Sequence, residues 1–403
     1  MDPSIYRLRQ QDILTFCVLA LLCLGAIMVQ SASMNVTGKL GPQWTPMGIK
    51  QAEFCVVALI VFFLIGRVDY SPMGRHAVTL RDWLTHPVLW MVVVTIALNL
   101  AVLIPGVGIV KNGARRWLPL GFTQLQPSEL AKWAAVIFLA WWLSTRPLDT
   151  EKFFKGFLPT LIPIGLLCLV VVIQDLGTAA LIAICALTML VAGRIKWWHL
   201  AIILPPALGA GLWFMMHKSY RWTRVTAFVD PWAHPQKEGY HMIQSLLSFS
   251  TGGVTGRGIG NGIQKLGYLP EDTTDFIFAV ICEELGLFGA LLTVALYLGI
   301  IYVAWQTLKN KKNEFSRLLA FGIGSMIGLQ ATINIAVATV SVPTKGLSLP
   351  LVSAGGSGLV ITCAALGLLY SITKNPTAEK EMPALTPFDL IYPEPACTDP
   401  LVG

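Results

Sequence analysis

The chain has 403 residues, of which 55% are hydrophobic and only 13% are charged, with a mean hydropathy of +0.65. Soluble domains carry about 25% charged residues and barrel strands alternate in polarity, so these continuous apolar runs exclude both and predict an all-α, polytopic helical membrane protein. The eight cysteines include no Cys-x-x-Cys pair, and the net charge of +7 has to be interpreted by side of the membrane, so we expect no disulfide framework, no zinc site and no nucleic-acid partner.

About ten segments approach the roughly 20 residues that a helix needs to cross a bilayer. They lie at 12–33, 50–67, 87–107, 127–145, 156–173, 176–193, 197–216, 275–305, 317–340 and 350–373. The first could be a signal peptide, but its length and the many spans after it favour an uncleaved helix. We therefore expect an N-terminal tail at 1–11, one transmembrane domain at 12–374, and a Pro-rich, disordered C-terminal tail at 375–403.

The Lys and Arg residues of the short loops fall on one side of this arrangement, which is therefore the predicted cytoplasmic side, with both termini inside. The polar segment 217–274 then forms a large outer loop between the seventh and eighth spans. This loop is basic, either because long loops translocate regardless of charge or because it binds an anionic ligand. Its Gly-rich run 252–262 indicates a tight turn or a close backbone approach.

Charged residues cluster where the fourth span begins. Glu129 and Lys132 are three residues apart, so they share a helix face and can neutralise each other. Either the pair merely eases insertion, or Lys132 joins Arg115 and Arg116 in holding a phosphate, for which guanidinium groups are well shaped.

Other polar residues lie near the outer ends of later spans. Asp175 either caps the sixth span or lines an outer cavity. In the outer loop, aromatic residues beside Arg221 and Arg224 suit a lipid interface or stacking on a sugar. Lys345 and Ser353 belong to a segment rich in Pro and Gly, whose irregular backbone is tolerated at a membrane boundary where it lines a cavity.

The eighth span carries acids, which are costly at membrane depth and therefore paired or functional. Asp275 stands at or near its start, where it is either a helix cap or a general base at the water boundary. Glu283 and Glu284 lie deeper and face different neighbours, and the simplest interpretation of both is a structural ion pair.

Taken together and in this order, six groups of residues resemble the SEDS family (shape, elongation, division and sporulation), to which FtsW, RodA and SpoVE belong. The resemblance extends from about residue 10 to residue 375. The motifs are Gly113–Trp117 with Gln126–Lys132, Asp175–Thr178, Arg224 with Asp230–Trp232, Gly239–Ser245, Lys265–Gly286 and Pro343–Ser357. The last of these is more similar to the cell-division branch (FtsW) than to the elongation branch (RodA).

The resemblance implies a peptidoglycan glycosyltransferase that polymerises lipid II at the outer face of the inner membrane, at the division septum. It implies that Asp275 is the catalytic base, that the transfer inverts the sugar, and that undecaprenyl diphosphate leaves. Expected partners are lipid II, the growing lipid-linked strand, a class B penicillin-binding protein (an FtsI-like transpeptidase) and other division proteins. No cofactor is certain, although a divalent cation is possible. Expected substrate-binding residues are Arg115, Arg116, Glu129, Lys132, Asp175, Arg221, Arg224, Gln244, Ser245, Lys265, Glu283, Lys345 and Ser353.

The sequence departs from the family pattern at Asp272 and Thr273, where Ala and His are usual. We expect the negative charge of Asp272 to raise the pKa of Asp275 where the two are close. Three alternatives remain. One is a lipid II flippase or other lipid transporter, because transporters also use intramembrane acids. The others are an elongation polymerase and a scaffold that recruits division partners.

Overall fold

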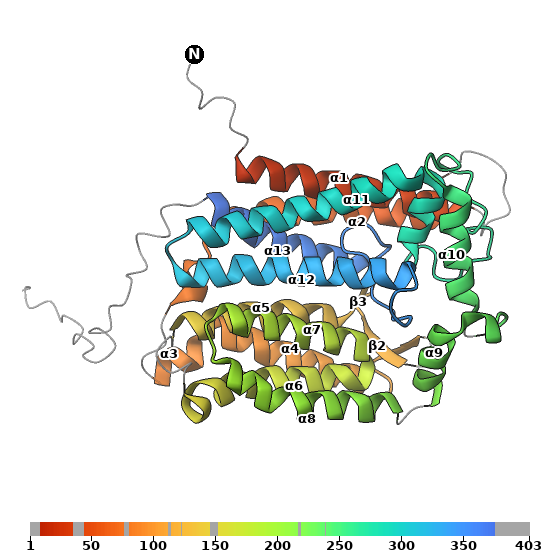
Figure 1. Ribbon diagram of the computed structural model, residues 1–403. Coiled ribbons are helices and arrows are strands. Elements are labelled where there is room, and N and C mark those ends of the chain that lie inside the picture. Colours follow the sequence, from red (N-terminus) through yellow and green to blue (C-terminus); the bar gives the residue numbers. More distant parts are fainter. Residues whose placement is uncertain are drawn as a thin grey trace, which may run out of the picture.

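The computed structural model describes residues 9–34, 44–75, 80–111, 114–121, 123–145, 152–216, 219–237 and 239–374. Within them the chain forms a bundle of long helices that lie side by side (Figure 1). The elements of the first half are α1 (Gln10–Ser33), α2 (Pro46–Ile65), α3 (Leu80–Thr85), α4 (Pro87–Leu103), β1 (Ile109–Lys111), β2 (Ala114–Pro119), β3 (Gln124–Leu125) and α5 (Pro127–Thr145). Those of the second half are α6 (Leu158–Gln174), α7 (Leu176–Ala192), α8 (Trp197–Met216), α9 (Ser219–Val229), α10 (Tyr240–Gly252), α11 (Ile277–Asn310), α12 (Glu314–Ala338) and α13 (Gly356–Lys374).

Each of the ten predicted spans corresponds to one helix among these residues. On length and composition alone, α1, α2, α11, α12 and α13 can each cross a membrane, while α4, α6 and α7 are shorter apolar helices. The prediction of a polytopic helical membrane protein is therefore confirmed. The expected C-terminal tail and most of the N-terminal tail lie outside the described residues.

Helix α12 lies inside the bundle, where it contacts α5, α7, α11 and α13. Helix α1 packs against both α2 and α11, and α13 packs against α2. Three helices start on proline, at Pro46, Pro87 and Pro127, because the missing N–H of proline would be unbonded in a first turn anyway. Helix α8 lies at the edge of the bundle beside α6 (Figure 1), and its His199 ring stacks on Phe157, which precedes α6.

The sequence predicted one continuous helix for the eighth span, but the structure shows a broken one. Helix α11 begins at Ile277, after Asp275, and its path breaks at Gly286, which has φ 65° and ψ −156°. At the break, the N–H groups of Arg257 and Gly258 donate to the carbonyls of Glu283 and Glu284 at 3.0 and 2.9 Å. The glycine-rich run thus supplies hydrogen bonds that the broken helix cannot make itself, which confirms the predicted close backbone approach.

A small antiparallel sheet, which the sequence did not predict, connects α4 to α5. Strand β2 is central: Arg115 pairs with Val110 of β1, and Leu118 pairs with Leu125 of β3. The predicted outer loop is also partly helical, since it contains α9 and α10. The sheet, α9 and α10 all gather at one end of the bundle, opposite α3 (Figure 1).

Candidate functional site

A pocket of about 1120 Å³ opens at the end of the bundle that carries the sheet. Its walls come from β2, the turn between α6 and α7, the outer elements α9 and α10, the segment before α11, and the loop before α13. Seven of the predicted site residues line it: Arg115, Arg116, Glu129, Asp175, Arg224, Lys345 and Asp275. Segments far apart in the sequence therefore meet around one charged cavity.

Asp275 lies just outside the helix that it was expected to begin. Phe276 is the N-cap residue of α11, so Asp275 is not a helix cap. Its half-buried carboxylate lines the pocket and accepts no hydrogen bond from the residues that the structure describes. Burial, reinforced by the negative charges of Glu271 and Asp175, raises the pKa of Asp275 to about 7, although Arg224 and Arg116 oppose the rise. A carboxyl group with this pKa can take up a proton near neutral pH.

The neighbour that matters for this pKa differs from the expected one. Among the neighbouring acids, Glu271 raises the pKa of Asp275 most, and Asp272 is not one of the groups that shift it. Glu271 has the unusual φ of 56° for a residue with a side chain, and its Oε2 accepts a hydrogen bond from Thr274 Oγ1 at 2.9 Å. This turn brings Glu271 into the pocket wall beside Asp275.

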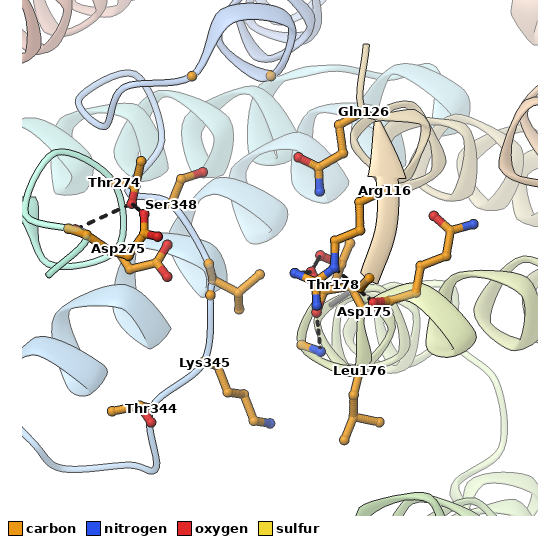
Figure 2. Close-up of a pocket in the computed structure, with 18 of the residues that line it drawn as sticks. Arg116, Gln126, Asp175, Leu176, Thr178, Thr274, Asp275, Thr344, Lys345 and Ser348 are labelled. Carbon is orange, nitrogen blue, oxygen red and sulfur yellow. Dashed lines mark hydrogen bonds and ion pairs between the residues drawn. The ribbon is translucent and has the colours of Figure 1, made fainter. Parts of the chain in front are cut away.

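Arg116 and Asp175 form the wall that faces Asp275 across the pocket (Figure 2). Arg116 Nη1 lies 3.8 Å from Asp175 Oδ2, and Arg116 Nε donates to the carbonyl of Gln174 at 2.9 Å. Asp175 also caps α7, because its Oδ1 accepts from the N–H of Gly177 at 2.9 Å. Both interpretations of Asp175 therefore hold, since it caps a helix and lines the cavity.

Further cations line the pocket, from β2 itself and from other elements. Lys345 projects from the loop before α13, and its pKa is lowered by burial, which Asp175 partly offsets. Arg224 and Lys237 come from the outer elements, and Arg115 from β2 donates to the carbonyl of Leu103 at 3.3 Å. A pocket with this charge pattern suits an anionic ligand.

Glu129 and Lys132 form the predicted pair, with Lys132 Nζ 2.7 Å from Glu129 Oε2. Lys132 is fully buried and also donates to Gln330 Oε1 at 2.7 Å, so it stands behind the pocket wall while Glu129 lines it. The pair thus neutralises charge inside the bundle, as the spacing indicated.

Lys265 and Glu283 lie away from the pocket. Lys265 Nζ is 2.8 Å from Glu284 Oε1 and 3.0 Å from Ser31 Oγ, and Glu283 accepts from the N–H of Ile263 at 2.8 Å. All these side chains hold the outer loop on the broken helix. The expected direct contact of Lys265 and Glu283 with substrate therefore has no support in their surroundings.

Three of the remaining predicted residues, Gln244, Ser245 and Ser353, also lie outside the pocket lining. Ser245 Oγ donates to the carbonyl of Ala338 at 2.6 Å, and Gln244 stands beside it on α10. Ser353 Oγ accepts a hydrogen bond from the N–H of Leu349 and donates one to the carbonyl of Thr274. Arg221 belongs to α9, but its side chain is outside the described part of the chain.

Sequence reasoning missed several pocket residues, among them Lys237, Glu271 and His241. Glu271 stands four residues before Asp275 in a segment that was already prominent, and only its turn geometry reveals its place in the wall. His241 stacks on Phe276 with ring centroids 6.0 Å apart. Burial, aided by the charge of Arg224 and partly offset by Glu271, lowers the pKa of His241 and so favours its neutral form.

A bundle of apolar helices with a charged pocket at one end defines a multi-pass membrane protein. The chain belongs to the FtsW/RodA/SpoVE family, described as cell cycle proteins, whose sequence model matches residues 11–378. Among its relatives is a probable peptidoglycan glycosyltransferase FtsW of Coxiella burnetii, 36% identical over 363 residues, or 89% of this chain and 95% of that one. Another, the probable FtsW of Nitrosococcus halophilus, is 39% identical over 92% of each chain.

Solved structures share the fold. A chain from a peptidoglycan synthase complex, described as coordinating polymerization and crosslinking, has a TM-score of 0.69 and 28% identity over 90% of this chain and 96% of that one. The rod shape determining protein RodA of Thermus thermophilus has a TM-score of 0.62 and 26% identity over 90% of this chain and 95% of that one.

Proposed function

We propose that this protein is a peptidoglycan glycosyltransferase that polymerises lipid II. The names of its FtsW relatives support the activity. The observation that carries the proposal is the state of Asp275: its carboxylate lines a large cationic pocket, has a pKa of about 7, and is free of hydrogen bonds from the described residues. Such a group can accept a proton from a substrate hydroxyl.

In the proposed reaction, the 4-hydroxyl of the acceptor GlcNAc gives its proton to Asp275. The oxygen attacks the anomeric carbon of the MurNAc at the end of the lipid-linked strand. The new glycosidic bond forms as the bond from that carbon to the diphosphate breaks, so the configuration inverts. Undecaprenyl diphosphate leaves with its electron pair, and Asp275 later loses the proton to water.

The negative charge that develops on the leaving diphosphate needs fixed positive charge nearby. Arg115, Arg116, Arg224 and Lys345 line the pocket and are the candidates for this role. Lys132 and Lys265 are not, because each is buried in an ion pair outside the cavity lining. A divalent cation remains part of the proposal. Among the described residues, no three His, Cys, Asp or Glu side chains lie close enough together to bind one. Adding a chelator to the polymerisation assay is the direct test.

The same relatives support a proposal for the cellular setting. Both the curated relatives named above are FtsW proteins and are more similar in sequence than the solved RodA, which supports a role in division, at the septum. The synthase complex that shares this fold supports a penicillin-binding transpeptidase as the crosslinking partner. The distribution of Lys and Arg supports cytoplasmic termini and a pocket on the outer face.

The test is polymerisation of purified lipid II by the purified protein. Asp275→Asn keeps the side-chain shape but cannot take the proton, so we expect a folded protein that makes no glycan. Asp272→Asn is the matched control, because this neighbouring carboxylate is not in the pocket lining, and it should retain activity. Glycan synthesis by Asp275→Asn would refute the proposal. Labelled lipid II in liposomes separates the alternatives: a transporter moves the label across the bilayer without making chains.

A further inference from the structure

Three consecutive backbone carbonyls are held in place immediately before α11. The N–H of Ala354 donates to the carbonyl of Thr273 at 2.8 Å. Ser353 Oγ donates to the carbonyl of Thr274 at 2.6 Å, and Asn334 Nδ2 donates to that of Asp275 at 2.9 Å. The segment that carries Asp275 is therefore bound by one backbone donor and two side chains.

The same two side chains hold the loop that precedes α13. Asn334 Nδ2 also donates to the carbonyl of Leu347 at 2.7 Å, and Ser353 Oγ accepts from the N–H of Leu349 at 2.7 Å. Asn334 and Ser353 are only 1% and 3% exposed, so water does not compete for these bonds. An amide nitrogen has two hydrogens, and both are used here, which fixes the orientation of the Asn334 side chain.

This loop runs directly past the carboxylate of Asp275. A Cβ atom added at Gly346 would lie 3.2 Å from Asp275 Oδ2, and Lys345 is the residue immediately before Gly346. Asn334 and Ser353 thus tie the segment of the acid to the loop of a pocket cation. Their bonds therefore link the two segments that carry Asp275 and Lys345.

No residue that the structure describes donates a hydrogen bond to the carboxylate of Asp275. The position of this side chain therefore depends on how its own backbone is held. Resting on the function proposed above, we propose that Asn334 and Ser353 are positioning residues, which hold Asp275 at the distance from substrate and from Lys345 that proton transfer requires. Neither touches the reacting atoms. A displacement of about 1 Å in a reacting group can cost about 100-fold in rate.

Purified Ser353→Ala tests the proposal, with lipid II polymerisation measured over a range of lipid II concentrations. We expect kcat to fall about 10- to 100-fold. The KM for lipid II should change much less, because Arg115, Arg116 and Arg224 line the pocket from elements that Ser353 does not hold. Ser353→Thr keeps the hydroxyl and should restore most of the rate. Asn334→Leu, which keeps the volume but removes both donors, should lower kcat in the same way.

The matched control is Ser371→Ala. Ser371 lies in α13, outside the pocket lining; it is fully buried and its Oγ donates to the carbonyl of Val68 at 2.9 Å. This variant therefore also removes a buried, hydrogen-bonded hydroxyl. Both alanine variants should lose similar thermal stability, but only Ser353→Ala should lose kcat. Equal kcat in the two variants overturns the inference, as does a raised KM with unchanged kcat. The proposed function is tested separately, by Asp275→Asn. If that variant polymerises lipid II, the proposed function is wrong, whatever the Ser353 variants show.

Discussion

Lys265 and Glu284 form an ion pair inside the bundle, with 2.8 Å between Nζ and Oε1, although 18 residues lie between them in the sequence. Both side chains are almost completely buried. Ser31 Oγ also donates to Glu284, as does the N–H of Gly260 at 3.0 Å. The pair therefore joins α1, the outer loop and the broken helix α11 at one point, where each charge depends on its partner.

Lys265→Met should destabilise the protein by about 3–5 kcal/mol, because it leaves the carboxylate of Glu284 buried and without its cation. Thermal unfolding in detergent measures this loss. The control Lys309→Met removes an exposed lysine near the end of α11, whose Nζ lies 5.0 Å from the centroid of the Trp305 ring, and should change stability by no more than about 1 kcal/mol. Similar melting temperatures for the two variants would show that the buried pair contributes nothing.

This pair also shows what the sequence could and could not predict. An acid inside an apolar helix indicates that a partner exists, and the sequence therefore predicted an ion pair for Glu284. It could not choose among the loop cations, because the partner is set by the break at Gly286 and the path of the glycine-rich loop. Lys265 was assigned to the substrate for that reason.

The pocket was predictable where a local motif carries the chemistry. Asp275, Arg116 and Asp175 each belong to a short distinctive segment, and the structure brings these segments together. Glu271 was not predictable, since its place depends on a backbone turn with positive φ. The sheet was missed because its strands are short and lie between two strongly apolar helices.

Gly286→Ala tests the break in α11. A Cβ atom at this position would lie 2.4 Å from the backbone nitrogen of Gly256, and the φ of 65° disfavours a side chain as well. We expect a loss of at least about 3 kcal/mol, or failure to accumulate in the membrane. Gly209→Ala is the control: outside the backbone of its own helix turn, no described atom lies within 4 Å of its added Cβ, so this variant should fold normally. A stable Gly286→Ala protein would contradict the described break.

Glu271→Gln tests the electrostatics of the proposed base. A base works when ionised, so the rate should rise with pH through the pKa of Asp275, about 7. Removing the negative charge of Glu271 lowers that pKa, and the acidic limb of the pH–rate profile should move to lower pH. The amide still accepts the hydrogen bond from Thr274. Asp272→Asn is the comparison, and it should leave the limb in place; the reverse result would make Asp272 the important neighbour.

Asp275→Asn should be more stable than the unaltered protein at high pH, although it is inactive. Folding raises the pKa of Asp275 from 3.8 to about 7, chiefly through burial. A raised pKa contributes stability that is fully present below pH 3.8 and is lost as the pH rises through about 7. At pH 8 the folded protein holds a poorly solvated carboxylate, and the amide removes this cost, a gain on the order of 1–3 kcal/mol. Melting temperatures measured from pH 5 to pH 8 check it. The advantage of Asp275→Asn should grow with pH, and a constant difference would mean that the carboxylate is already well solvated in the folded state.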